Sequence, residues 1–160
     1  MRKALLLGLA LIAAPLAAKD SLGVFGEWAA FRDPSAPRCY AIAMPRPSRA
    51  ARDYQAFATI GTWPKRAVRG QVHFRLSRKI AQNAAISLSL GGTRFALTGG
   101  GGDAWAQDKA IDAAIVAGMR SARSMTVSSR DARGRRFSDT YTLEGAATAM
   151  DAATVGCARH

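Results

Sequence analysis

Residues 86–97, ISLSLGGTRFAL, carry the clearest indication of fold in the chain. Large apolar residues alternate with serines over residues 86–90, and the alternation resumes at Phe95 after the pair Gly91-Gly92. A period of two places one face of a strand in a core and the other in water. Because a Gly-Gly pair suits a two-residue turn, this stretch predicts an antiparallel β-hairpin.

The same alternation extends outward from this hairpin in both directions. Further strands are predicted at residues 22–31, 39–44, 54–63, 68–77, 125–127 and 137–143, the last two joined by a hairpin tip at 130–135. The apolar period becomes helical at residues 108–121 and 145–157. We therefore predict a mainly β protein, an antiparallel β-sandwich or rolled sheet of about seven strands with two helices in the C-terminal half.

Two shorter segments carry local predictions. Gly99–Gly102 is expected to be a flexible connector, because it lacks the Gly-Lys-Ser/Thr ending of a phosphate loop. Thr142 is expected to cap the final helix.

The N-terminus has the layout of a secretory signal peptide. Arg2 and Lys3 precede an uncharged run rich in Ala and Leu, and Leu16-Ala17-Ala18 offers a cleavage site. That run is too short to span a membrane, which takes about 20 residues. We predict a signal peptide at residues 1–18, one domain at residues 19–160, and no transmembrane span in the mature chain.

The positive charge of the chain favours anionic partners. Removal of Arg2 and Lys3 with the signal peptide lowers the formal charge from +12 to +10. The candidate contacts for an anionic ligand are Arg69 and Arg75, which are expected to share a strand face, and Arg133, Arg135 and Arg136 on one hairpin. Arg46, Arg49 and Arg52 form a further basic loop. A GC-rich genome would account equally for a high arginine content.

Cys39 and Cys157 are the two cysteines of the chain. An even count in an exported protein favours one disulfide between them. The alternative is a catalytic or redox thiol, which is disfavoured because the chain has no Cys-x-x-Cys motif and neither cysteine has a nearby histidine in sequence.

The residues offer no catalytic motif. No serine lies in a Gly-x-Ser-x-Gly context. If the chain were a hydrolase, His73, Asp103 and Asp139 would be the candidate residues. We predict no cofactor, no metal and no enzymatic activity.

The order of several short motifs resembles the invasion-associated locus B (IalB-like) family. Its opening is matched by Phe25-Gly26-Glu27-Trp28 followed by a segment at 39–45, CYAIAMP. The second half matches through residues 103–158, where Trp105, a helix ending at 117–120 (AGMR), Gly134, the segment 139–145 (DTYTLEG) and Cys157 follow in order. The middle of the chain, residues 46–84, matches least.

The resemblance implies an exported alphaproteobacterial protein, periplasmic or associated with the outer membrane, with a mainly β fold and a Cys39–Cys157 pairing. It supplies no catalytic residues, and it does not imply a role in host invasion. We expect a non-enzymatic envelope protein that binds an anionic envelope component, such as lipopolysaccharide or anionic lipid, or a protein partner. A periplasmic hydrolase and a structural envelope-assembly or stress factor are the alternatives. Export makes nucleic acid an unexpected partner.

Overall fold

A computed structural model describes residues 18–158. The predicted signal peptide therefore lies outside the described residues, except for Ala18. The strands are β1 (Asp20–Phe25), β2 (Trp28–Asp33), β3 (Arg38–Ala43), β4 (Phe57–Trp63), β5 (Val68–Arg75), β6 (Ile86–Leu90), β7 (Thr93–Gly100), β8 (Asp103–Ala106), β9 (Ser124–Arg130) and β10 (Arg136–Thr142). The helices are η1 (Pro64–Arg66), α1 (Lys109–Met119) and α2 (Ala146–Ala158).

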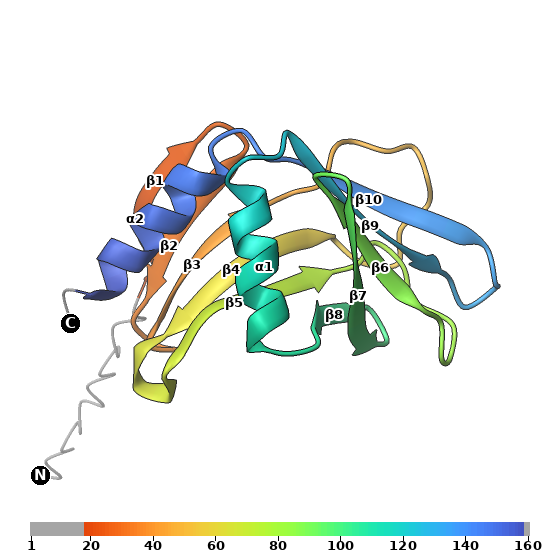
Figure 1. Ribbon diagram of the computed structural model, residues 1–160, viewed down its shortest axis with the longest axis horizontal. Helices are drawn as coiled ribbons and strands as arrows, with labels where there is room; N and C mark the ends of the chain where they lie inside the picture. The colour runs from red at the N-terminus through yellow and green to blue at the C-terminus, as the bar shows by residue number, and fades with distance from the viewer. Residues whose placement is uncertain (1–17, 159–160) are drawn as a thin grey trace, which may run out of the picture.

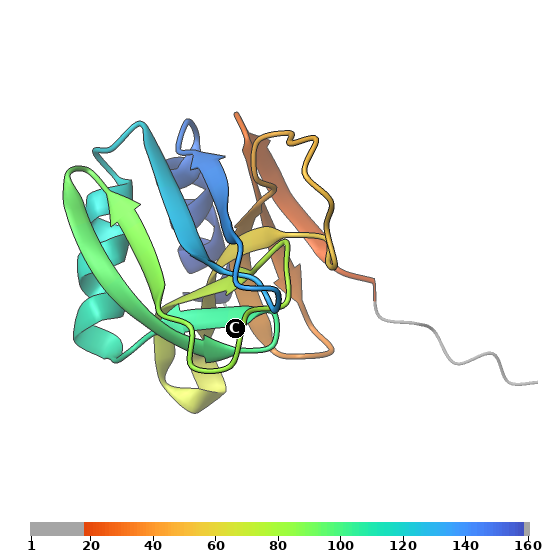
Figure 2. The ribbon, with the colours of Figure 1, turned by 90° about the vertical axis from the view of Figure 1, so that its right-hand side faces the viewer.

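All ten strands form one antiparallel sheet in the order β1-β2-β3-β4-β5-β8-β7-β6-β9-β10. The sheet curls back on itself, as Figure 2 shows from the side, with the orange β1–β3 strands opposite the blue β9–β10 hairpin. Phe74 of β5 and Tyr141 of β10, five places apart in the strand order, meet in the core with ring centroids 5.8 Å apart. The mainly β prediction is confirmed, and the described architecture is a rolled sheet.

The predicted number of strands was too low for two reasons. The segment predicted as one strand at residues 22–31 divides at Gly26-Glu27 into β1 and β2. Gly99–Gly102 was predicted to be a flexible connector. Its first two residues instead belong to β7, and the residues that follow Gly102 form β8. Gly99 is needed there because the Cβ of any larger residue would collide with the backbone carbonyl oxygen of Asp103.

The hairpin predicted from residues 86–97 is confirmed. Gly91 and Gly92 take φ angles of 56° and 82° between β6 and β7, as a two-residue turn of this type requires. Leu88 and Leu97 point into the core, while Ser89 and Arg94 face out. Alternation along the strands therefore sets the two faces of the sheet.

Both helices cover the concave face of the sheet (Figure 1). Ile115 and Met119 of α1 and Met150 of α2 are buried. The α1 helix begins after Asp108, whose side chain accepts a hydrogen bond from the N–H of Ile111. Among residues 18–158, no helix covers the opposite face of the sheet, called here the outer face.

The predicted disulfide is present and joins α2 to the sheet. Cys39 in β3 and Cys157 in α2 are bonded across a sequence separation of 118, and Cys39 is fully buried. The predicted cap from Thr142 is not what the structure shows, because Thr142 ends β10 and its hydroxyl accepts a hydrogen bond from Arg46 Nε at 3.0 Å. No helix within residues 18–158 is both long and apolar enough to cross a membrane.

Candidate functional site: a serine–arginine hollow on the outer face

The outer face of β6, β7, β9 and β10 is polar because each of these strands alternates. Ser87, Ser128 and Ser138 lie directly opposite one another across β6, β9 and β10. One step along, Ser89 lies opposite Arg94 of β7. The strands thus align hydroxyls in rows, with Arg94 at the end of one row and the pair of Arg130 and Arg136 in a neighbouring row.

These side chains surround a hollow of about 460 Å³, which we call the serine–arginine hollow. Its lining consists of Ala85, Ser87, Ser89, Arg94, Ser128, Ser129, Arg130, Arg136, Phe137 and Ser138. Among the described residues, no aspartate or glutamate lines it. The hollow is therefore a positively charged site whose walls carry hydroxyl and guanidinium donors.

Much of this hydrogen-bonding capacity is unused. Within residues 18–158, the hydroxyls of Ser87, Ser89, Ser128 and Ser138 have no protein partner. Ser129 differs from them, since its hydroxyl donates to the carbonyl of Ala85 at 3.0 Å. Hydroxyls and guanidinium groups that face solvent without partners are the groups that bind phosphate or sulfate oxygens.

The arginines of the hollow also lack acidic partners. In the described part of the chain, Arg94 and Arg136 make no ion pair, and Arg130 donates to the backbone carbonyl of Gly134 at 2.8 Å. A second hollow, of about 210 Å³, adjoins the first and shares Arg136, Phe137 and Ser138 with it. Arg52 and Arg78 line this second hollow together with Asp139, and Arg78 is paired with Asp131, so its lining is mixed in charge.

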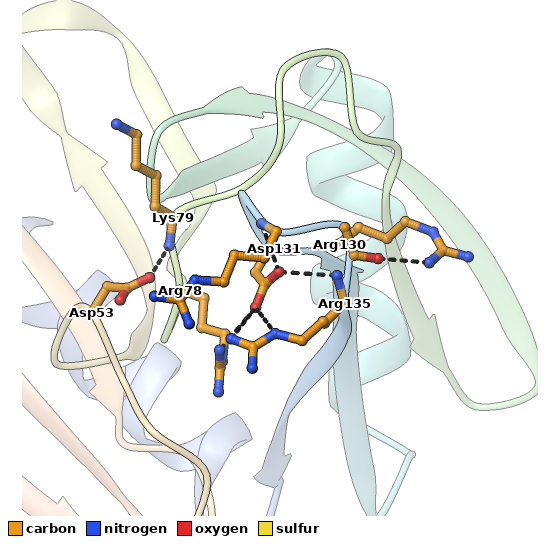
Figure 3. A network of polar contacts seen from close by, with 8 residues as sticks. Asp53, Arg78, Lys79, Arg130, Asp131 and Arg135 are labelled. Atoms are coloured by element: carbon orange, nitrogen blue, oxygen red, sulfur yellow. Dashed lines mark hydrogen bonds and ion pairs between the residues drawn. The ribbon is translucent and has the colours of Figure 1, made fainter.

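A buried carboxylate holds the β9–β10 hairpin tip in place beside the hollow. Asp131 is 3% exposed, and it accepts hydrogen bonds from the backbone N–H groups of Arg133 and Arg135. Figure 3 shows it at the centre of the network, with Arg78 at 2.8 Å and the Arg135 side chain at 3.1 Å. One acid thus orders two arginine side chains and leaves an excess of positive charge.

The network also sets the acidity of Asp131. Burial by itself raises the pKa of this carboxyl group, but the N–H groups of Arg135 and Arg133 and the Arg135 guanidinium outweigh it. The pKa of Asp131 consequently lies below its ordinary value. Asp131 is therefore ionised wherever the protein is folded near neutral pH.

The predicted arginines separate into different surroundings. Arg136 lines both hollows, Arg135 is paired with Asp131, and Arg133 is exposed on the tip. Arg75 is paired with Asp103 at 2.5 Å on the outer face. Arg69 instead lines a cleft against the two helices.

The expectation that Arg69 and Arg75 share a strand face was therefore wrong. Gly70 takes a φ of +66°, and the β4–β5 register shifts between Gly61 and Trp63. Such a bulge changes the direction of the side chains beyond it. The two arginines consequently face opposite sides of the sheet.

The candidate hydrolase residues are only partly brought together. His73 Nε2 lies 3.0 Å from Asp103 Oδ1, but Asp139 is buried elsewhere and accepts a hydrogen bond from the N–H of Ser77 at 2.8 Å. The other oxygen of Asp103 is taken by Arg75. Within residues 18–158, no group of three metal-ligating side chains occurs.

The sequence reasoning missed the serines and Arg94. The alternation had placed Ser87, Ser89 and Ser138 on a wet face, but it did not show that β9 would align Ser128 between them. Compared with known proteins, the chain matches no family model, no curated protein sequence and no solved structure. The resemblance to the invasion-associated locus B family therefore stays a prediction from the sequence.

Proposed function

We propose that the protein is an exported envelope protein that binds an anionic component of the bacterial envelope through the serine–arginine hollow. The observation that carries the proposal is a hollow lined by Arg94, Arg130 and Arg136 and by four unpartnered serine hydroxyls, with no acid in its lining within residues 18–158. Arginine binds phosphate oxygens in a two-pronged geometry, and hydroxyls add directed donors.

The overall charge supports the same ligand class. The formal charge of +10 on the chain from Lys19 onward attracts any anionic surface, and it does so over about 8–10 Å at physiological salt. The hollow adds short-range hydrogen bonds to that attraction. Phosphate groups of lipopolysaccharide or anionic lipid combine both features, so they fit the hollow better than an uncharged ligand does.

Export is the second part of the proposal. It is supported by the layout of residues 1–18 and by the Cys39–Cys157 disulfide, because structural disulfides persist in oxidising compartments. Intact mass of the protein from the envelope fraction should correspond to a chain beginning at Lys19, two hydrogens lighter than the reduced chain. A mass that includes residues 1–18 would contradict cleavage.

The binding proposal is tested with vesicles of phosphatidylcholine alone and of phosphatidylcholine with lipopolysaccharide. The protein should sediment with the lipopolysaccharide vesicles and be released as salt is raised. The Arg94→Gln/Arg136→Gln variant should lose affinity at least about tenfold, because two guanidinium contacts are lost.

The matched control is Arg66→Gln/Arg123→Gln, which removes the same charge at exposed positions outside the hollow. This variant should bind nearly as well as the wild-type protein. An equal loss in the two double variants would show that total charge, and not the hollow, governs binding. Binding that persists unchanged in high salt would instead indicate a protein or apolar contact and would contradict the proposal.

A hydrolase is the second candidate, and the pairing of His73 with Asp103 is the observation in its favour. Any turnover detected on envelope substrates should then be lost in His73→Ala. Turnover retained in that variant would exclude His73 from the reaction.

A further inference from the structure

Trp105 stands out among the three tryptophans because of its exposure. Trp28 is fully buried in the core, whereas Trp105 on β8 remains 37% exposed on the outer face. An exposed indole has no role in the core. The contacts of Trp105 therefore indicate what its exposed ring can bind.

One face of the indole is covered by the neighbouring strand. His73 of β5 lies opposite Trp105 in the register, and the two rings stack with centroids 5.0 Å apart and planes 29° apart. Phe57 of β4 contacts the far side of His73 edge-on at 5.7 Å. The three rings stand side by side on the sheet.

Ion pairs and ring contacts hold this row in place. Asp103 accepts from His73 at 3.0 Å through one oxygen and from Arg75 at 2.5 Å through the other. The Arg75 guanidinium lies 3.9 Å from the centre of the Tyr54 ring. Because the support is fixed beforehand, a ligand that stacks on Trp105 orders few side chains on binding.

The strand on the other side of Trp105 from β5 is β7. Thr98 lies opposite Trp105, with Ala96 and Gly100 on the same face of β7, and all three are exposed. None of these side chains is large enough to cover an indole ring. Trp105 therefore offers a flat apolar wall beside the hydroxyl of Thr98.

The same strand leads from Trp105 to the serine–arginine hollow. Arg94, four residues from Thr98 along β7, lines that hollow, and Ala96 lies opposite Ser87. Four residues of a strand span about 13 Å. A ligand of two or three sugar units can thus reach from the indole to the arginines.

We infer that Trp105 is the stacking platform for a sugar ring of a phosphorylated oligosaccharide whose phosphate group occupies the serine–arginine hollow. This inference rests on the proposed function and specifies its ligand. The apolar C–H face of a pyranose packs on an aromatic ring, as ligand sites commonly combine aromatic walls with a few directed polar groups. A bare lipid phosphate would leave Trp105 without a role.

The test uses three probes in titration calorimetry: the phosphorylated core oligosaccharide of deacylated lipopolysaccharide, the same oligosaccharide without phosphate, and inorganic tripolyphosphate. Trp105→Ala should weaken binding of the phosphorylated oligosaccharide about tenfold. Binding of tripolyphosphate should stay unchanged in that variant. Trp105→Phe should keep most of the affinity, and Val24→Ala, at a 72% exposed position on β1, is the matched control that should change nothing.

The outcomes separate this inference from the function on which it rests. Wild-type protein that binds tripolyphosphate but not the oligosaccharide would overturn the inference and leave the hollow as an anion site. Equal affinity of wild-type and Trp105→Ala protein for the phosphorylated oligosaccharide would overturn it as well, as would an equal loss for tripolyphosphate. A wild-type protein that binds none of the probes would overturn both the inference and the proposed function.

Discussion

The outer face of the sheet divides into two regions that treat arginine differently. In the region formed by β1–β5 and β8, Arg38 is paired with Asp33 at 3.7 Å, and Arg75 with Asp103 at 2.5 Å. In the region formed by β6, β7, β9 and β10, Arg94 and Arg136 have no acidic partner within residues 18–158. Aromatic rings accompany the first set of arginines, and serines accompany the second.

This difference shows where the charge of the protein is available. A guanidinium already bonded to a carboxylate and stacked on a ring, as Arg75 is on Tyr54, contributes to the stability of the surface. A guanidinium beside unpartnered hydroxyls keeps its donors free for a ligand. The formal charge alone does not distinguish these two kinds of arginine. Substitutions in the first region should lower stability, whereas substitutions in the second region should lower ligand binding.

The largest effect is expected from the disulfide, which joins α2 to β3 behind the first region. The Cys39→Ser/Cys157→Ser variant should lose up to about 4–5 kcal/mol of unfolding free energy, because its unfolded chain is no longer closed across 118 positions. Denaturant unfolding of the variant beside the oxidised wild type measures the loss.

Hydrogen exchange of the same variant sharpens the regional comparison. Protection in α2 should fall first, because Cys157 anchors that helix to β3. Protection in β6 and β9, which lie in the other region, should fall less. An even loss over all elements would show that the two regions unfold as one unit.

The next effect concerns the ion pairs of the first region. Asp103→Ala should destabilise the protein by about 1–2 kcal/mol, because it removes the partner of both His73 and Arg75. Asp108→Ala, whose side chain caps α1, is a useful reference at about 1 kcal/mol. An Asp103→Ala variant as stable as the wild type would show that these contacts contribute nothing measurable.

Acid should expose a third difference, carried by Asp131 in the second region. Its pKa is lowered in the folded protein, so its stabilising contribution is present above the ordinary aspartate pKa of about 3.9 and is lost as pH falls through the folded value. Asp131→Asn should therefore be less stable than the wild type at neutral pH and approach it in acid. Thermal unfolding over a pH series measures this convergence.

Asp33 provides the matching test in the first region. Its pKa is lowered mainly by the hydroxyl of Ser35, with smaller help from the N–H of Ala36 and from Arg38. Asp33→Asn leaves Asp131 in place, so this variant should still lose the stabilising contribution of Asp131 as pH falls. Identical pH profiles for Asp131→Asn and the wild type would contradict the role given to the hairpin-tip network.

The elements of the fold were predictable where a local pattern decides them. The hairpin around Gly91-Gly92 and the helix after Asp108 follow from period and turn chemistry within a few residues. The strand β8 was missed because its four residues follow four glycines, and its formation depends on pairing with β5 and β7. The change of face at Arg69 likewise depends on a bulge opposite β4.

The candidate site was less predictable because it is assembled across strands. Arg136 was identified from a local cluster, but the hollow also needs Ser87 and Arg94, which come from a different hairpin. The strand order β7-β6-β9-β10 brings them together, and no spacing in the sequence encodes that order. His73 and Asp103, 30 positions apart, were named together as hydrolase candidates, but no pattern in the sequence indicated that the two would be in contact.

The smallest expected effect is also the sharpest test of the division. Arg94→Gln/Arg136→Gln should change the unfolding free energy by less than about 0.5 kcal/mol, because neither guanidinium has an acidic partner to lose within residues 18–158. Removing two like charges from a crowded basic surface even favours the folded state slightly. A loss of about 1–2 kcal/mol, equal to that expected for Asp103→Ala, would mean that these arginines support the fold. If the variant instead keeps its stability while its binding to lipopolysaccharide falls, Arg94 and Arg136 serve ligand binding, and the arginines paired with acids serve the stability of the fold.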